Sequence, residues 1–220
     1  MPRLRRLVSP IRGGFPMLTL YGQYMSRAQR CLWTLEELGV PYQHVKTNQT
    51  LGESRTPEFL KINPNGHVPA LKDGDFILWE SMAIAMYVAK KYGQGSLWPA
   101  SVEDEGHVMQ WALWASLEVE TFVVNFLRHA MLYPPEKRRP ELAEEALRVL
   151  PAPLKVLDDA LAGREYLVGN RFSVADINVS TVLLLADVHK HLGVDTFGNV
   201  TGWLQRVADR PAWQKLPSLK

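Results

Sequence analysis

Ser26 stands in the short segment between a predicted strand, 17–21, and a predicted helix, 27–38. A hydroxyl at that junction and the partial positive charge of the helix N-terminus can both face a bound thiol and favour its anion. A serine in the same place can instead serve only as the N-cap of the helix. The position of Ser26 therefore indicates either a thiolate site or a structural cap.

Glu80 and Ser81 form a second pair that could do chemistry, at the junction of a predicted strand, 76–79, and a predicted helix, 81–92. A helix N-terminus offers unpaired N–H groups and partial positive charge, which suit a carboxylate. The side chain of Glu80 can bind an ammonium group. The pair therefore suits a group that carries both charges. The alternative is that Ser81 is only the N-cap and Glu80 only a partner of the helix dipole.

Pro69 lies inside the first strand of a predicted hairpin, which runs over 68–72, turns at Asp73-Gly74 and returns over 76–79. Proline has no N–H and cannot donate to a strand ladder, so it is confined to strand edges and irregular positions. A proline here leaves neighbouring backbone groups free for another partner. A simple edge-strand proline is the alternative.

Cys31 is the one cysteine of the chain, which excludes an internal disulfide, a C-x-x-C redox pair and a cysteine-rich zinc site. It lies five residues beyond Ser26 on the apolar face of the predicted helix, where a lone buried cysteine acts as a small hydrophobic residue. His129, His189 and His191 show no ligand spacing with Cys, Asp or Glu. We therefore expect no metal site.

The elements that must position these residues are predicted to be strands and helices in the first half of the chain and helices alone in the second half. The pattern predicts a strand, a helix and a strand over 17–21, 27–38 and 42–47, a crossover unit that makes the two strands parallel. A helical turn over 57–62 precedes the hairpin. After a segment with linker composition, 94–101, the strand signals end.

The second half of the chain reads as helical throughout. The long stretch 102–133 is expected to turn Trp111, Trp114, Leu117, Val124 and Leu127 mostly inward. Pro151 and Pro153 must break or kink the stretch 141–161. The most apolar stretch, 173–192, must be central, and Ser173 with Asp176 forms a capping box at its start, a folding device rather than a catalytic pair. Short helices are expected over 201–209 and 210–215.

These patterns predict an α/β domain over 17–93, a linker over 94–101 and an all-α helical bundle domain over 102–220. Residues 1–16 are predicted to be a flexible basic tail with four arginines and no acid, a short targeting segment or an upstream extension before Met17. Removing those four charges from the formal +2 leaves the rest at −2, which argues against a nucleic-acid partner. The longest apolar stretch near the C-terminus is about half of the roughly 20 residues that span a bilayer, so we expect no membrane protein.

Four segments with this order and spacing resemble the glutathione transferase family. They read LYGQYMSRAQRCLWTLEELGVPY, NPNGHVPAL, WESMAIAMYVAKKY and YLVGNRFSVADI. The resemblance covers Met17 to about Trp213. It implies a thioredoxin-like N-terminal domain, a helical C-terminal domain and a serine-type active site.

The resemblance assigns a role to each candidate residue. It implies that Ser26, four residues before Arg30, donates a hydrogen bond to the glutathione thiolate, with Tyr24 as the rival donor. It implies a cis Pro69 and backbone pairing of Val68 with the cysteinyl part of glutathione. Glu80 and Ser81 then hold the γ-glutamyl end. His67 and Lys72 are candidates for the glycine carboxylate.

The resemblance implies conjugation of glutathione to small hydrophobic electrophiles, or reduction of organic peroxides, by a cytoplasmic homodimer. Glutathione acts as co-substrate, and no cofactor is expected. Trp114, Phe122 and Phe126 are candidates for the electrophile pocket and equally for a packed core. Two alternatives remain: a glutathione-dependent lyase, dehalogenase or isomerase, and a non-catalytic binding or assembly module with the same fold.

Overall fold

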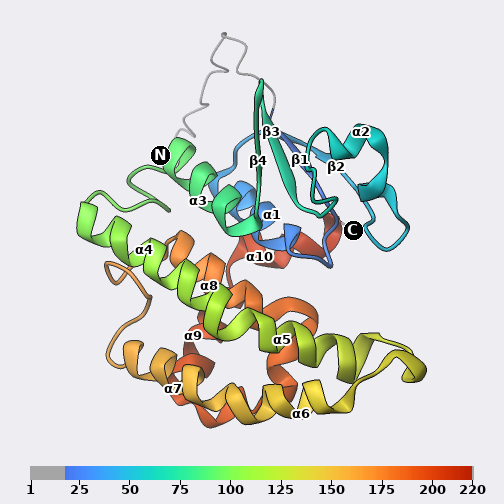
Figure 1. Cartoon of the computed structure of the whole chain (residues 1–220). Helices are drawn as coiled ribbons and strands as arrows, with labels where there is room; N and C mark the ends of the chain where they lie inside the picture. The colour runs from blue at the N-terminus through green and yellow to red at the C-terminus, as the bar shows by residue number, and fades with distance from the viewer. Residues whose placement is uncertain (1–17, 220) are drawn as a thin grey trace, which may run out of the picture.

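A computed structural model describes residues 18–219 of the chain. The expectations for the tail 1–16 and for Met17 as the first strand residue lie outside the described residues. A small sheet with its helices sits on a larger set of helices (Figure 1), and the two parts meet where α1 and α3 pack against α8 and α10. No helix in the described part of the chain is both long and apolar enough to cross a membrane.

The sheet has four strands in the order β2-β1-β3-β4. Strand β1 (Leu18–Tyr21) pairs in parallel with β2 (Tyr42–Val45), which confirms the crossover unit. Strand β3 (Ala70–Asp73) is antiparallel to both β1 and β4 (Phe76–Trp79). The prediction that Pro69 lies inside a strand is wrong by one residue, because β3 begins just after the proline, which cannot donate to the ladder.

Helices cover both faces of the sheet. Helices α1 (Ala28–Leu38) and α3 (Ser81–Tyr92) contact each other on one face, and both keep the predicted bounds to within one residue. The short α2 (Pro57–Leu60) lies on the other face, where Phe59 packs with Val68 and Ala70. Gly39 ends α1 in the left-handed conformation, with a φ of 62°, which glycine adopts without strain.

The rest of the chain is helical, as predicted. The α-helices are α4 (Val102–Trp114), α5 (Thr121–Phe126), α6 (Pro140–Val149), α7 (Pro151–Ala160), α8 (Val174–Leu184), α9 (Gly198–Ala208) and α10 (Pro211–Lys215). Short 3₁₀ segments are Glu53–Arg55, Pro135–Lys137, Leu185–His191, Val194–Thr196 and Leu216–Leu219. The predicted break within 141–161 occurs at Pro151, the first residue of α7.

Two π-helical segments, Ala115–Glu120 and Leu127–Leu132, interrupt the long helix that begins with α4. A π turn takes more residues than an α turn, so it shifts the phase of the inward face. The prediction that Leu117 points inward is therefore wrong: its side chain is 70% exposed. Val119 and Glu120 are buried instead.

Helix α8 is the centre of the helical domain, because all eleven of its residues are buried. It begins with the predicted capping box, in which the carboxylate of Asp176 accepts the N–H of Ser173 at 2.9 Å. The helix ends at Leu184 rather than near Leu192. The reason is that Ala186 and Asp187 have left-handed φ angles of 52° and 56°, which a right-handed helix cannot contain.

Candidate active site

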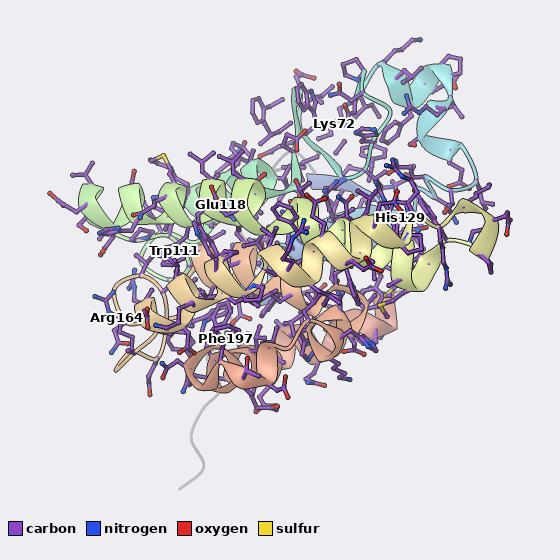
Figure 2. All side chains as sticks on the ribbon, turned by 60° about the horizontal axis from the view of Figure 1, so that its bottom comes forward. Lys72, Trp111, Glu118, His129, Arg164 and Phe197 are labelled. Carbon is purple, nitrogen blue, oxygen red and sulfur yellow. The ribbon has the colours of Figure 1, made fainter. Side chains whose placement is uncertain are left out.

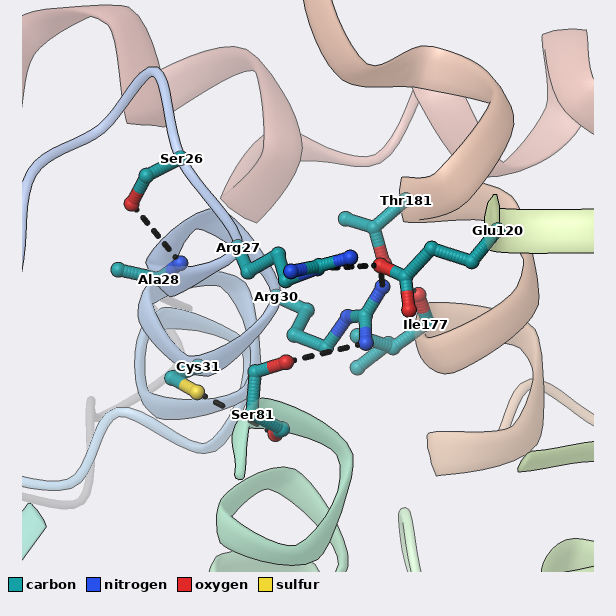
Figure 3. Close-up of polar contacts among 9 residues, drawn as sticks. All are labelled: Ser26, Arg27, Ala28, Arg30, Cys31, Ser81, Glu120, Ile177 and Thr181. Atoms are coloured by element: carbon teal, nitrogen blue, oxygen red, sulfur yellow. Dashed lines mark hydrogen bonds and ion pairs between the residues drawn. The ribbon is translucent and has the colours of Figure 1, made fainter. Parts of the chain in front are cut away.

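Ser26 lies at the start of α1, in the loop that leaves the first strand. Its hydroxyl donates to the carbonyl of Gln23 at 2.7 Å and accepts the N–H of Ala28 at 3.1 Å (Figure 3). The accepted bond is the capping role expected as one alternative. The hydroxyl can rotate and donate its proton to a bound thiolate in place of the Gln23 carbonyl, because a thiolate is a stronger acceptor than a neutral carbonyl.

Gly22, which the sequence analysis missed, lets this loop run close to the helix that follows. Its φ is 145°, and a Cβ atom at this position would lie 2.6 Å from the Cβ of Ala28 and 3.6 Å from that of Val68. The N–H of Gly22 donates to the carbonyl of Val45 at 3.0 Å, and the carbonyl of Gly22 is hydrogen-bonded to Nε2 of His44 at 2.8 Å. Both partners belong to β2. Only glycine therefore fits where Ser26 and Val68 are brought to the same end of the sheet.

The backbone N–H and C=O of Val68, near this loop, form no hydrogen bond with any described residue, although the side chain is buried. The Val68–Pro69 peptide bond is cis, as the resemblance implied. Both backbone groups of Val68 can therefore pair with an extended peptide laid against them.

Arg30 links the two parts of the molecule and was not singled out as a site residue from sequence. It is 2% exposed, and its Nη1 donates to the Ser81 hydroxyl at 3.1 Å while its Nη2 donates to Oε1 of Glu120 at 3.0 Å (Figure 3). Arg27 donates from Nε to the same oxygen at 3.0 Å. Burial raises the pKa of the Glu120 carboxyl, but Arg30 and Arg27 outweigh it and hold that pKa below its ordinary value.

Glu80 and Ser81 sit where α3 begins. Glu80 is the N-cap residue, with an exposed side chain and strained backbone angles of φ 73° and ψ 113°. Strain of this kind in a non-glycine residue gathers at functional sites. A cavity of about 290 Å³ opens here between the sheet domain and the helical domain. Its walls include Arg27, Arg30, Glu80, Ser81, Leu113 and Glu120.

A second, very small cavity of about 10 Å³ lies beside Ser26. Its apolar walls come from Val123, Val124, Val182 and Leu185. The aromatic residues named from sequence are not among its lining. The ring centroids of Trp114 and Trp111 lie 5.0 Å apart, and those of Phe126 and His191 lie 6.4 Å apart in a stacked arrangement. Phe122 is partly buried against the core.

His67 and Lys72 are both exposed, on either side of the Val68–Pro69 peptide. The backbone carbonyl of His67 accepts from the side-chain amide of Asn63 at 2.8 Å. Lys72 lies on β3 at the centre of the sheet, far from Arg164 and Phe197 on the helical domain (Figure 2).

Two other candidates, Cys31 and Tyr24, lie near these residues: Cys31 contacts Ser81, and the carbonyl of Tyr24 accepts the N–H of Ser26 at 2.7 Å. Burial raises the pKa of the Cys31 thiol to about 12, and its Sγ donates to the Ser81 carbonyl, which fits a packing role. Burial raises the pKa of the Tyr24 hydroxyl, and the charge of Asp187 adds to that effect, so the hydroxyl is protonated at neutral pH, the form that donates a hydrogen bond. Among residues 18–219, no group of three or more His, Cys, Asp or Glu side chains could hold a metal ion.

Two family models match most of the chain. Residues 16–90 match the model of the glutathione S-transferase N-terminal domain, and residues 119–211 match that of the C-terminal domain. The chain is 33% identical to glutathione S-transferase GstB of Escherichia coli over 91% of this chain and 97% of that protein. It is 34% identical to the probable glutathione S-transferase GSTF2 of Oryza sativa over 92% and 96%.

Solved structures give the same result. A glutathione S-transferase-I bound with lactoylglutathione superposes with a TM-score of 0.82 at 32% identity, over 93% of this chain and all of that one. A theta class glutathione S-transferase from Xanthomonas axonopodis pv. citri, with glutathione bound, superposes with a TM-score of 0.81 at 28% identity, over 91% and 96%. The four-stranded sheet followed by a helical domain is therefore the fold of these enzymes.

Proposed function

Because the chain belongs to the glutathione S-transferase family of enzymes, we propose that it conjugates the glutathione thiolate to small hydrophobic electrophiles and can also reduce organic peroxides. The observation that carries this proposal is the placement of three groups at one end of the sheet: the Ser26 hydroxyl, the unpaired backbone of Val68 and the N-terminus of α3 at Ser81. Each suits a different part of the tripeptide.

Glutathione would lie across these three groups. The backbone of Val68, supported by Pro69, pairs with the cysteinyl residue in an antiparallel manner. The γ-glutamyl carboxylate takes the N–H groups at Ser81, and its ammonium group takes Glu80. His67, and with it Lys72, would be candidates for the glycine carboxylate. This leaves the thiol facing Ser26.

The chemical step needs an anionic sulfur. The Ser26 hydroxyl turns from the Gln23 carbonyl to the sulfur, and together with the α1 N-terminus it lowers the thiol pKa from about 8.5 toward neutrality. The thiolate then forms the new bond to the electrophilic carbon, the leaving group departs with its bonding electrons, and the thiol proton is already in solvent. Val123, Val124 and Leu185 offer an apolar wall beside it, with Trp114, Phe122 and Phe126 as candidates for the wider pocket.

A homodimer is the proposed assembly. Apolar side chains are exposed on the edge strand β4, at Phe76 and Trp79, and on α4 and the π segment after it, at Leu113 and Leu117. Large exposed apolar patches mark interaction surfaces. We also propose the division into domains 17–93 and 102–220 with a linker over 94–101, and a cytoplasmic location.

Two measurements test this function. Calorimetry should detect glutathione binding, and a panel of aryl halides, activated alkenes and organic hydroperoxides should reveal a conjugation or reduction rate above the uncatalysed one. Binding without turnover of any compound would favour the non-catalytic module. Turnover in which glutathione is regenerated would favour a lyase, dehalogenase or isomerase.

A further inference from the structure

A cavity of about 540 Å³ opens in the last part of the chain, where the segment after α8 meets α9 and α10. Cavities of this size hold small molecules. Among the described residues, its lining shares none with the proposed glutathione site, and none with β4 or α4, which carry the proposed dimer surface. A ligand can therefore bind here while the active site is occupied.

Apolar side chains form one part of the cavity wall. Leu204 and Ala208 lie four residues apart on one side of α9, and the buried Val194 comes from the segment before that helix. The half-buried indole of Trp213, from α10, packs against the buried ring of Trp33, with the ring centroids 4.7 Å apart. These groups give an apolar surface that suits a ring or a short alkyl chain.

The charged side chains at this cavity include one carboxylate without a partner. The carboxylate of Asp187 forms an ion pair with Nζ of Lys190 at 3.5 Å. Burial lowers the pKa of His189 below its ordinary value, so its imidazole is neutral at pH 7 and adds no positive charge. Among residues 18–219, no side chain pairs with the Asp195 carboxylate. The cavity therefore carries an excess of one negative charge.

The basic residues of the α10 segment do not compensate this charge. Arg210 forms an ion pair with Glu37, and Lys215 forms one with Glu36, both on α1. The glutamate side chains are only 13% and 11% exposed, so the two pairs are partly shielded from solvent. The carboxylate of Asp195 therefore remains available to a cation that enters the cavity.

Two glutamine side chains add further acceptors to the lining. Nε2 of Gln205 donates to the Asp209 carboxylate at 2.8 Å, and Nε2 of Gln214 donates to the Ala208 carbonyl at 2.6 Å. In the described part of the chain, neither glutamine side-chain oxygen accepts a hydrogen bond. Because each oxygen has two acceptor sites, the polar lining suits a ligand group that only donates.

We propose that this cavity binds a small organic ammonium ion, with the charged group at Asp195 and the glutamine oxygens and the apolar part against Trp213 and α9. An ammonium group has three donors, no acceptor and a positive charge, which matches this lining. A cation beside an indole is also attracted by the negative face of the ring. A carboxylate in the same place would be repelled by Asp195, so the site selects its ligand by charge.

The test measures binding to the full chain by calorimetry, with 2-phenylethylamine as the ammonium probe and 2-phenylethanol as its uncharged counterpart. The wild type should bind the amine more tightly than the alcohol at pH 7, where the amine is charged. Asp195→Asn should weaken amine binding by about 3- to 5-fold, as for a solvent-accessible ion pair, and leave alcohol binding unchanged. Asp75→Asn, at an exposed residue of the turn between β3 and β4, is the matched control and should behave as the wild type.

A competition experiment separates this cavity from the active site. Saturating S-hexylglutathione, a probe for the proposed glutathione site, should leave the amine affinity unchanged, whereas competition would place the amine in the active site and overturn the inference. Absence of amine binding, equal wild-type affinities for amine and alcohol, or an unchanged amine affinity in Asp195→Asn would also overturn it. Each of these results leaves glutathione conjugation, and so the proposed function, untouched.

Discussion

The side chains of Arg30 and Glu120 join the two domains across 90 residues of sequence, with Nη2 of the arginine 3.0 Å from Oε1 of the glutamate. The guanidinium is almost fully buried, and the carboxylate side chain is 11% exposed. Removing one member of a buried pair leaves the other charge uncompensated, which costs far more than loss of a surface pair. The geometry of the α3 N-terminus, which Arg30 also contacts through Ser81, therefore depends on the helical domain.

Glu120→Gln should destabilise the protein by about 3 kcal/mol at neutral pH, because Arg30 loses its buried counter-ion. The pKa of Glu120 is lower in the folded protein than its ordinary 4.5, so the charged form stabilises the fold above that pH. As pH falls through the folded pKa, this contribution is lost. Urea unfolding of both proteins should show a stability difference that is widest near pH 7 and narrows below about pH 4. A constant difference would contradict the ion-pair account.

Glu80→Gln and Ser81→Ala should weaken glutathione binding by about 10-fold or more, yet change the chemical step little, because they contact the end of glutathione remote from sulfur. Calorimetry gives the affinity, and single-turnover kinetics at saturating glutathione give the rate of the step. Asp75→Asn, at an exposed turn residue of the same hairpin, is the matched control. Wild-type affinity in both site variants would remove this pair from the binding site.

Asp176→Ala should reduce stability rather than binding. The carboxylate is fully buried and accepts from the Leu167 amide at 3.0 Å, the Trp203 indole at 2.9 Å and the Ser173 amide at 2.9 Å. Each buried donor left without a partner costs about 1–3 kcal/mol, so the loss should be at least about 3 kcal/mol. Asp176→Asn keeps an acceptor and should lose less. Thermal unfolding measures both, and a fall in glutathione affinity in the folded fraction would show that the residue does more than cap α8.

Gly22→Ala should lower both stability and turnover, because the new methyl group would collide with Ala28 and displace the loop that carries Ser26. Gly95→Ala is the control: its φ is also positive, at 78°, but no atom lies within 4 Å of its added Cβ. Melting temperature and conjugation rate should therefore fall more in Gly22→Ala. Equal behaviour of the two variants would contradict the close-approach explanation.

Local patterns predicted most of the fold. The crossover unit and helices α1 and α3 follow from apolar spacing and from Gly39, and the start of α8 follows from Ser173 and Asp176. These signals work because each lies within a few residues of the structure that it specifies.

The errors and omissions arise where distant residues decide the structure. No periodicity reveals that Glu120 meets Arg27 and Arg30, since that contact forms only when the domains pack. The π segment that turns Glu120 inward and Leu117 outward cannot be read from a 3.6-residue period. The sequence does not distinguish Gly22 from other loop glycines, because its constraint is the nearby side chain of Ala28, which would collide with a Cβ atom at this position.

The central claim is that Ser26 stabilises the thiolate of bound glutathione. The direct measurement is a pH titration of the ultraviolet absorbance of enzyme-bound glutathione thiolate, in the wild type, Ser26→Ala and the control Tyr24→Phe. We expect the wild type and Tyr24→Phe to show a thiol pKa well below the free value of about 8.5. Ser26→Ala should raise it by about 1 to 2 units, since one hydrogen bond to a charged group is lost. The same low pKa in Ser26→Ala and the wild type would contradict the account.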